Sequence, residues 1–256
     1  MDLKLVDVEV KKWLKEARSN VLSQMHQKIV VNTKTSNKDL VTNIDKQNEN
    51  FLVNKIREFD PDAKIMGEEG FGDHVTSLDG HVWIVDPIDG TMNFVKQGNH
   101  FAMMISLYID GNAELGYIYN VMKDELISGG RSIGVFNNDK LLAPPVDTHL
   151  SEGLVGLSGP LVLNDVFKMQ AIAKQSLGMR IYGSAGLDII SVIKGELVGY
   201  ISYLKPWDIA AGLACGQPLG LIITNIDGEP IDMISSNLVL ISTKNTHRDI
   251  LSILKG

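Results

Sequence analysis

Cysteine is almost absent from this chain of 256 residues, which has a single one at Cys215. One thiol excludes an intramolecular disulfide framework. A nucleophilic role is one interpretation of Cys215, but the residue follows a run of small residues at 210–214 that is typical of a buried helix. We therefore interpret Cys215 as a small buried apolar residue.

The chain also lacks long apolar runs and a surplus of positive charge. No uninterrupted apolar stretch is long enough to span a bilayer, and residues 1–10 carry acidic side chains instead of the apolar centre of a signal peptide. The formal net charge is −7, and the basic side chains of 11–18 are interrupted by Trp13, Leu14 and Glu16, as on the solvated face of a helix. We therefore expect a cytoplasmic protein that binds neither membranes nor nucleic acid.

The remaining composition is that of an ordinary globular protein, with 44% hydrophobic and 21% charged residues. In the first half, apolar residues recur at helical spacing over 14–29 and 44–59, and Asp60-Pro61 ends the second pattern. A polar loop at 32–38 separates the two predicted helices. Asp110-Gly111-Asn112 between two apolar runs predicts a hairpin, and 137–139 predicts another turn. The expected strands are Lys64–Met66, Val82–Val85, Phe101–Ile109 and Ala113–Val121.

The second half alternates between expected strands and helices, which is typical of an α/β layer. The join lies near Pro144-Pro145, so we predict an N-terminal α+β subdomain over 1–145 and a C-terminal α/β subdomain over 146–256. The expected strands are Leu154–Leu157, Arg180–Tyr182, Leu197–Tyr203 and Leu219–Thr224; the expected helices are Asp165–Ser176, Leu187–Ile193 and Asp208–Cys215.

The most informative segment is Trp-Ile-Val-Asp-Pro-Ile-Asp-Gly-Thr at 83–91. An apolar strand ends at Asp86, Pro87 pre-sets a bend, and Asp89 follows three positions later. The carboxylates and the carbonyl of Ile88 are hard oxygen ligands of the kind that Mg²⁺ prefers. A helix that starts near Thr91 would also direct backbone N–H groups at a phosphate. Taken alone, the segment is equally compatible with a plain turn.

Two further acidic segments have ordinary explanations when each is taken alone. The adjacent residues Glu68-Glu69 lie in a glycine-flanked loop, where acidic pairs are usually solvated. Asp208 stands at the start of an expected helix, where aspartate is a common N-cap.

Together these segments resemble the inositol monophosphatase family. Its marks are Gly-Glu-Glu, then Trp-Ile-x-Asp-Pro-Ile-Asp-Gly-Thr-x-Asn-Phe, then Trp-Asp-x-Ala-Ala/Gly-Gly; here they occur in that order at 67–69, 83–94 and 207–212. The family's Asp-Leu-Val-Thr-x-x-Asp also matches, at 39–45. The resemblance covers nearly the whole chain, and its long central motif is highly specific.

The resemblance implies a layered αβαβα sandwich, with an antiparallel sheet and helices in the N-terminal half and a mixed α/β layer in the C-terminal half. It also implies two to three Mg²⁺ ions and a set of residue roles. The metal ligands would be Glu68, Asp86, the Ile88 carbonyl, Asp89 and Asp208. Glu68 and Thr91 would orient and deprotonate the attacking water, with Asp45 supporting Thr91. Gly90, Thr91, Ala185 and Asp208 would contact the substrate.

The implied activity is hydrolysis of small phosphate monoesters such as inositol monophosphate, by metal-activated water and without a covalent enzyme intermediate. Relatives also hydrolyse fructose bisphosphate, the 2′-phosphate of NADP and adenosine bisphosphates. Animal members that prefer inositol phosphate carry a Glu shortly before the Trp-Asp pair, whereas 200–205 has no acid here. Lys205 is either a partner for a second anionic group or a solvated lysine. The substrate therefore stays open, and the resemblance also implies a homodimer that lithium inhibits.

Two other classes of function make different demands on the sequence. A non-catalytic ligand-sensing or RNA-associated module would be expected to lack at least one of the implied ligands, and all are present. A nucleotide-dependent kinase would need a P-loop or a glycine-rich kinase loop, and neither pattern occurs. We therefore expect a phosphatase.

Overall fold

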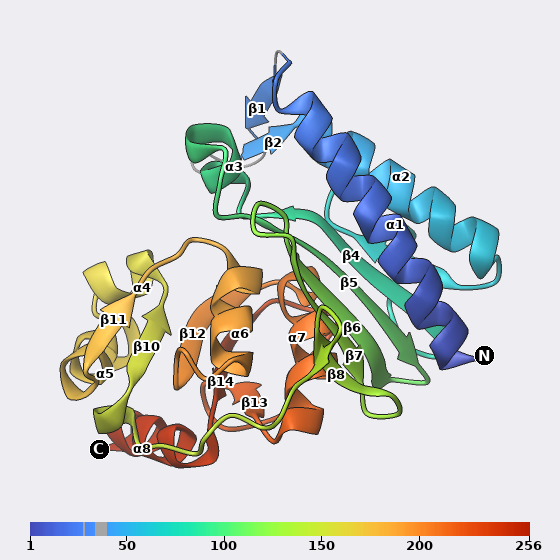
Figure 1. The fold of residues 1–256 in the computed structure, drawn as a ribbon. Coiled ribbons are helices and arrows are strands. Elements are labelled where there is room, and N and C mark those ends of the chain that lie inside the picture. Colours follow the sequence, from blue (N-terminus) through green and yellow to red (C-terminus); the bar gives the residue numbers. More distant parts are fainter. Residues whose placement is uncertain (28, 34–39) are drawn as a thin grey trace.

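The computed structural model describes residues 1–27, 29–33 and 40–256, and these form five alternating layers of helix and sheet (Figure 1). Two long helices cover one face of a seven-stranded sheet. Two shorter helices lie between that sheet and a five-stranded sheet, whose other face carries further helices from the C-terminal part of the chain. The predicted αβαβα sandwich is thus confirmed.

The outer layer of the N-terminal half consists of α1 (Leu3–Gln24) and α2 (Asn43–Phe59). Asp2 begins α1, since its side chain accepts hydrogen bonds from the N–H groups of Lys4 and Leu5. A capping box between Thr42 and Asp45 begins α2. Both helices bury an apolar stripe against the seven-stranded sheet. A two-stranded ribbon, β1 (Val31–Thr33) with β2 (Leu40–Thr42), precedes α2.

The seven-stranded sheet has its strands in sequence order, and all its pairs are antiparallel except the first. The predicted hairpin at 110–112 joins the third and fourth strands of this sheet, with Asp110 and Gly111 at φ values of 47° and 78°. Its strands are β3 (Lys64–Gly67), β4 (His81–Asp89), β5 (Ala102–Ile109), β6 (Asn112–Asn120), β7 (Glu125–Gly130), β8 (Gly134–Asn137) and β9 (Lys140–Leu141).

The five-stranded sheet is mixed, with the order β11-β10-β12-β14-β13. Its strands are β10 (Leu154–Leu157), β11 (Gly178–Arg180), β12 (Gly199–Leu204), β13 (Ile222–Asn225) and β14 (Asn237–Ser242). The helices besides α1 and α2 are α3 (Thr91–Gln97), α4 (Gly159–Leu163), α5 (Met169–Gln175), α6 (Ala185–Ile193), α7 (Pro206–Gly216) and α8 (Lys244–Lys255).

Several predicted boundaries were wrong. The first helix ends at Gln24, so Ile29 lies beyond it. The helix expected at 165–176 is confined to α5, because Asp165, Phe167 and Lys168 have left-handed φ values of 46°, 55° and 56°. The strand expected at 180–182 is β11, two residues earlier. Residues 34–38 of the predicted polar loop, and Asp39 of the family motif, lie outside the described residues.

The middle layer is held tightly against the seven-stranded sheet, where Gly116 of β6 faces α7. A Cβ atom at Gly116 would lie 2.5 Å from the Ala211 carbonyl oxygen and 2.9 Å from the Ala214 Cβ. The thiol of Cys215 donates to the Gly116 carbonyl at 3.2 Å and is buried, in line with its predicted structural role. A side chain at Gly116 would therefore displace α7, which carries Asp208.

We accordingly expect Gly116→Ala to lower the free energy of unfolding by about 2 kcal/mol, or roughly 4–8 °C in Tm, because the backbone of α7 must move to admit a methyl group. Thermal unfolding followed by circular dichroism measures this. Gly178→Ala is the matched control, since its new Cβ would meet no atom closer than 3.4 Å. Equal Tm values for the two variants would contradict this account of the packing.

Among the described residues, no helix combines the length and the apolar character needed to cross a membrane.

Candidate metal centre

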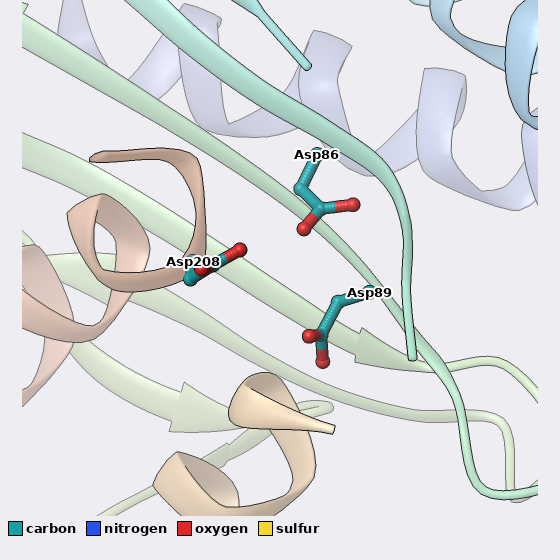
Figure 2. Close-up of side chains that lie close together, drawn as sticks. All are labelled: Asp86, Asp89 and Asp208. Carbon is teal, nitrogen blue, oxygen red and sulfur yellow. The ribbon is translucent and has the colours of Figure 1, made fainter. Parts of the chain in front are cut away.

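Strand β4 brings two of the predicted acidic residues to one place through a β-bulge, not through the turn that Pro87 was expected to fix. Asp86 pairs with Met104 of β5, but Asp89 pairs with Ala102, so three steps along β4 match two along β5. In a regular strand, residues three positions apart point to opposite faces. The extra residue in the bulge restores a common side. The side chains of Asp86 and Asp89 therefore point into the same space, as Figure 2 shows.

The third acidic residue comes from the other half of the chain. Asp208 lies in the first turn of α7, which begins at Pro206 rather than at Asp208 as predicted. Its carboxylate accepts a hydrogen bond of 2.7 Å from the N–H of Lys205, so Lys205 is the N-cap and Asp208 supports it from the third helical position instead of being the N-cap itself. Asp86, Asp89 and Asp208 each offer a carboxylate oxygen, and these oxygens lie within 4.8 Å of one another (Figure 2).

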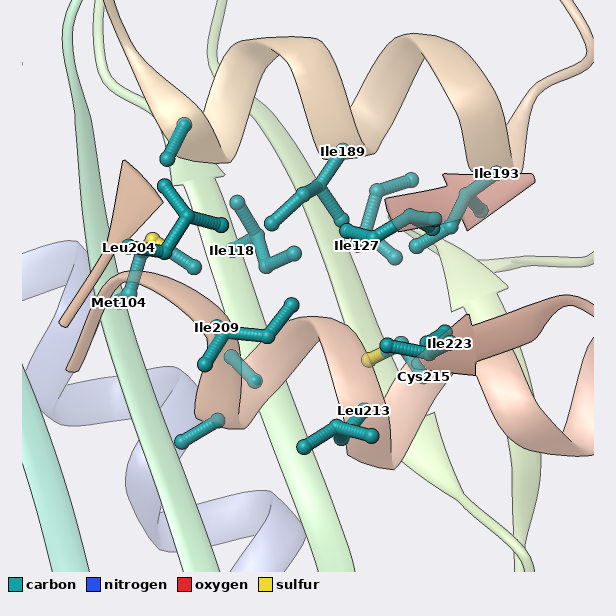
Figure 3. Close-up of a cluster of buried hydrophobic side chains, with 14 of the residues drawn as sticks. Met104, Ile118, Ile127, Ile189, Ile193, Leu204, Ile209, Leu213, Cys215 and Ile223 are labelled. Carbon is teal, nitrogen blue, oxygen red and sulfur yellow. The ribbon is translucent and has the colours of Figure 1, made fainter. Parts of the chain in front are cut away.

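The helices on either side of this cluster are fixed by a shared apolar core. Ile189 and Ile193 of α6 and Ile209 and Leu213 of α7 point into one cluster together with side chains of the seven-stranded sheet (Figure 3). That core takes buried residues from both halves of the chain. The position of Asp208 relative to β4 is thus set by packing between the predicted subdomains.

Electrostatic repulsion within the cluster is strong. Burial raises the pKa of Asp86 well above its ordinary value, and the charges of Glu68, Asp89 and Asp208 raise it further. Burial likewise raises the pKa of Asp208 to about 8, with Asp89 adding to the rise. One oxygen of Asp86, Oδ1, is buried with no hydrogen-bond partner. Buried acids without neutralising partners are the usual signature of a cation site.

Asp89 also joins the two halves through hydrogen bonds. It accepts from the N–H of Ala185 at 3.0 Å, from the N–H of Gly186 at 2.8 Å and from the hydroxyl of Ser184. These donors form the N-terminal end of α6, which favours an anion. They oppose the rise that burial causes in the pKa of Asp89. Asp89 is therefore oriented even without a cation.

The predicted pair Thr91 and Asp45 is in contact. The Thr91 hydroxyl lies 3.0 Å from Asp45 Oδ1 and 3.1 Å from the Ile88 carbonyl oxygen, so its single hydrogen has two acceptors within reach. Asp45 is buried and also accepts from the N–H and the hydroxyl of Thr42. Burial raises its pKa, while these hydrogen bonds counteract the rise.

Glu68 follows β3 in a loop, and its charge contributes to the raised pKa values of Asp86 and Asp208. A residue that the sequence analysis missed orders this loop. Glu49 of α2 is fully buried and accepts from the N–H groups of Glu69 at 2.6 Å and Phe71 at 2.9 Å. A sequence signal for Glu49 was available, because it lies in the apolar stripe of α2, where a buried charged residue must have polar partners.

Two asparagines that hold the backbone around the cluster were also missed by the sequence analysis. Asn48 of α2 donates to the Pro87 carbonyl at 2.7 Å and so holds the bulge. Asn93 of α3 donates to the carbonyls of His100 at 2.9 Å and Tyr182 at 2.8 Å, which ties α3 to the loop before α6. Gly90 between the bulge and α3 has a φ of 89°, which explains glycine at this position.

A pocket of about 300 Å³ opens beside the cluster. Asp89, Asp208 and Ala185 line it together with groups from β10, β12 and α6. Its walls hold apolar side chains such as Ile181 and several hydroxyl and carboxyl groups. No Lys, Arg or His of the described residues lines this pocket, and Lys205 is not part of it.

Comparison with known proteins agrees with this geometry. The family model described as the inositol monophosphatase family matches residues 2–255. The chain belongs to the inositol monophosphatase family. An inositol-1-monophosphatase of Bacillus subtilis is 38% identical over 250 residues, which are 96% of this chain and 94% of that protein. The chain is thus similar to phosphomonoesterases of this family along nearly its whole length.

Two further matches show the range of the family. A Nus factor SuhB of Vibrio cholerae is 33% identical over 226 residues, covering 85% of this chain and 83% of that protein. A crystal structure of an IMPase/NADP phosphatase complexed with Mg²⁺ and phosphate matches with a TM-score of 0.92 and 30% identity, covering 99% of this chain and 96% of the other. The fold and the family are therefore shared with a phosphatase whose solved structure holds Mg²⁺ and phosphate.

Proposed function

We propose that the acidic cluster of Asp86, Asp89 and Asp208 binds two to three Mg²⁺ ions and that the chain hydrolyses small phosphate monoesters of the inositol monophosphate type. The observation that carries this proposal is three buried or partly buried carboxylates whose oxygens lie within 4.8 Å of one another, with one buried oxygen of Asp86 lacking a hydrogen-bond partner. Oxygen donors and uncompensated negative charge fit a hard divalent cation. In this proposal Glu68 and the Ile88 carbonyl complete the ligand set.

The bound ions would neutralise the phosphate, stabilise the attacking and leaving oxygens and acidify water. Such help is needed because the uncatalysed hydrolysis of phosphate monoesters is extremely slow. The chain's own groups supply positioning and proton transfer. Gly90 and Thr91 would contact the phosphate, and Ala185 and Asp208 would contact the alcohol side of the substrate. The reaction would proceed without a covalent enzyme intermediate.

Thr91 is proposed to orient the attacking water together with Glu68. When the Thr91 hydroxyl donates to Asp45, its oxygen lone pairs are free to accept a hydrogen bond from water. Glu68 is the proposed acceptor of the water's proton. Asp45 acts through Thr91, because its carboxylate is buried and held by the Thr42 cap.

Replacing Thr91 is therefore expected to separate two effects. Thr91→Ala removes the hydroxyl and should lower kcat by about 100-fold or more, since a positioned proton-transfer group contributes about that much. Thr91→Ser keeps the hydroxyl and should retain most of the activity. Steady-state phosphate release with Mg²⁺ measures both variants. Similar kcat values for the alanine and serine variants would remove Thr91 from the mechanism.

The substrate class follows from the pocket. Since no basic side chain of the described residues lines it, the pocket offers nothing that would pair with a second phosphate. This favours monophosphates of polyols over fructose 1,6-bisphosphate and adenosine 3′,5′-bisphosphate. NADP, which carries a 2′-phosphate beside a large anionic remainder, is the second candidate, supported by the solved IMPase/NADP phosphatase.

The test is phosphate release from inositol 1-phosphate, fructose 1,6-bisphosphate, NADP and adenosine 3′,5′-bisphosphate, each with Mg²⁺ and with EDTA. We expect Mg²⁺-dependent release that is fastest with inositol 1-phosphate. Release from none of them would support the non-catalytic ligand-sensing module. Inhibition by millimolar lithium, a homodimer, two subdomains that meet near 145 and cytoplasmic residence stay predictions from the resemblance and the sequence.

A further inference from the structure

The mechanism leaves one buried acid unused. Asp188 of α6 is only 2% exposed, and its Oδ1 has no hydrogen-bond partner. No other hydrogen bond to its carboxyl occurs among the residues that the structure describes. Burying a carboxyl without any partner costs free energy, so such a group in a folded protein needs an explanation.

Asp188 lies at the pocket rather than deep in an apolar layer. It lines the same pocket as Asp89 and Asp208, one helical turn after Ala185. The opposite side of its carboxyl is enclosed by β10, where a Cβ on Gly156 would lie 2.5 Å from Asp188 Oδ1. The glycine thus leaves room for Oδ1 on the β10 side, and a polar partner from the pocket would meet the rest of the carboxyl group rather than Oδ1.

The chemistry of the pocket indicates what that partner is. Besides Asp188, its lining includes the side chains of Ser158, Tyr200 and Ser202, and no cation of the described residues. Walls that carry hydroxyls and carboxyls match the hydroxyls of a polyol, each of which can donate to a carboxyl oxygen and accept from a serine or tyrosine. A second phosphate would instead find no cation of the described residues in this lining.

We propose that Asp188 accepts a hydrogen bond from a hydroxyl of the substrate's alcohol portion and so selects polyol phosphates over phosphates of apolar alcohols. This inference rests on the proposed phosphatase function, which supplies the substrate to this pocket. Selection arises because an alcohol without hydroxyls leaves the buried carboxyl unpaired, whereas a polyol pairs it. Asp188 contacts the part of the substrate that does not react, so its effect falls on binding.

The experiment compares two ligands that share a ring. The KM of inositol 1-phosphate and the Ki of cyclohexyl phosphate, as its competitor, are measured for the wild type, Asp188→Ala and Asp188→Asn with saturating Mg²⁺. The matched control is Ser191→Ala on the same helix, whose hydroxyl donates to the Leu187 carbonyl and does not line this pocket. Tm values show whether each variant is folded.

We expect Asp188→Ala to raise the KM of inositol 1-phosphate by about tenfold or more, as for the loss of a hydrogen bond that leaves a substrate hydroxyl unpaired in the pocket. Asp188→Asn should lie between the alanine variant and the wild type, because its amide oxygen still accepts. The Ki of cyclohexyl phosphate should change less than about twofold, and Ser191→Ala should change neither constant. Equal weakening of both ligands, or a lower Tm with both constants unchanged, would assign Asp188 a structural role and overturn the inference. Wild-type protein that releases no phosphate with Mg²⁺ would instead overturn the proposed function, and this inference with it.

Discussion

Asp89→Asn is expected to lower phosphate release at least about a thousandfold while leaving the chain folded. Asp89 is one of three carboxylates proposed to hold the ions, and electrostatic stabilisation of the reacting phosphate depends on those ions. The amide is isosteric, and its oxygen still accepts from one N–H at the N-terminal end of α6, although its NH₂ group then faces the other. Removing the negative charge of Asp89 also reduces the electrostatic repulsion between the carboxylates in the metal-free protein.

The measurement is kcat/KM for inositol 1-phosphate, together with Tm in EDTA. Asp73→Asn is the matched control, since Asp73 lies in the same half of the chain, pairs with Arg57 and is not one of the proposed metal ligands. It should keep full activity. Activity of Asp89→Asn within tenfold of the wild type would show that the cluster is not the catalytic centre.

Metal-free protein is expected to lose thermal stability as the pH rises from 5 to 8, by about 5–10 °C in Tm. Burial, with a further contribution from the charge of Asp89, raises the pKa of Asp208 to about 8. Burial raises the pKa of Asp188 to about 8 as well. An aspartate with a raised pKa keeps its proton in the folded state where the unfolded chain has released it. Between about pH 4 and pH 8 the folded state therefore binds more protons, and stability falls with rising pH.

Thermal unfolding in EDTA at pH 5 and pH 8 tests this expectation. Added Mg²⁺ should raise Tm most at pH 8, because a cation that binds only the folded state stabilises it and replaces the protons. Asp208→Asn in EDTA should show a shallower fall than the wild type. A Tm that is constant or rises with pH in EDTA would contradict the account of the cluster's electrostatics.

The fold was predictable where local patterns are strong. Helix α2 was found to within one residue because Asp60-Pro61 ends it, and the hairpin at 110–112 was found because aspartate and glycine tolerate positive φ. The strands β7, β8 and β14 and the helix α8 were not predicted, since short strands and terminal helices are stabilised mainly by neighbours distant in sequence. The helix predicted from 165 does not form before α5, because three residues of that segment have left-handed φ values.

The site was predicted at the level of residue identity but not of geometry. Sequence motifs singled out Asp86, Asp89 and Asp208, and the structure brings their oxygens together. The roles of Glu68, Thr91, Asp45, Gly90 and Ala185 stay predictions, although their contacts fit those roles. The bulge in β4 was missed because a bulge depends on the register of the partner strand, which a single sequence does not display. Glu49 and Asp188 were missed because each lies in the apolar stripe of its helix and faces segments that are distant in sequence.

Calorimetric titration of EDTA-stripped protein with Mg²⁺, for the wild type and Asp208→Asn side by side, tests the central claim most directly. The account predicts that the wild type binds at least two ions per chain and that Asp208→Asn loses at least one of them or binds it about ten- to a hundredfold more weakly. A wild type that binds no Mg²⁺, or a variant that binds it as the wild type does, would show that the acidic cluster is not the metal centre.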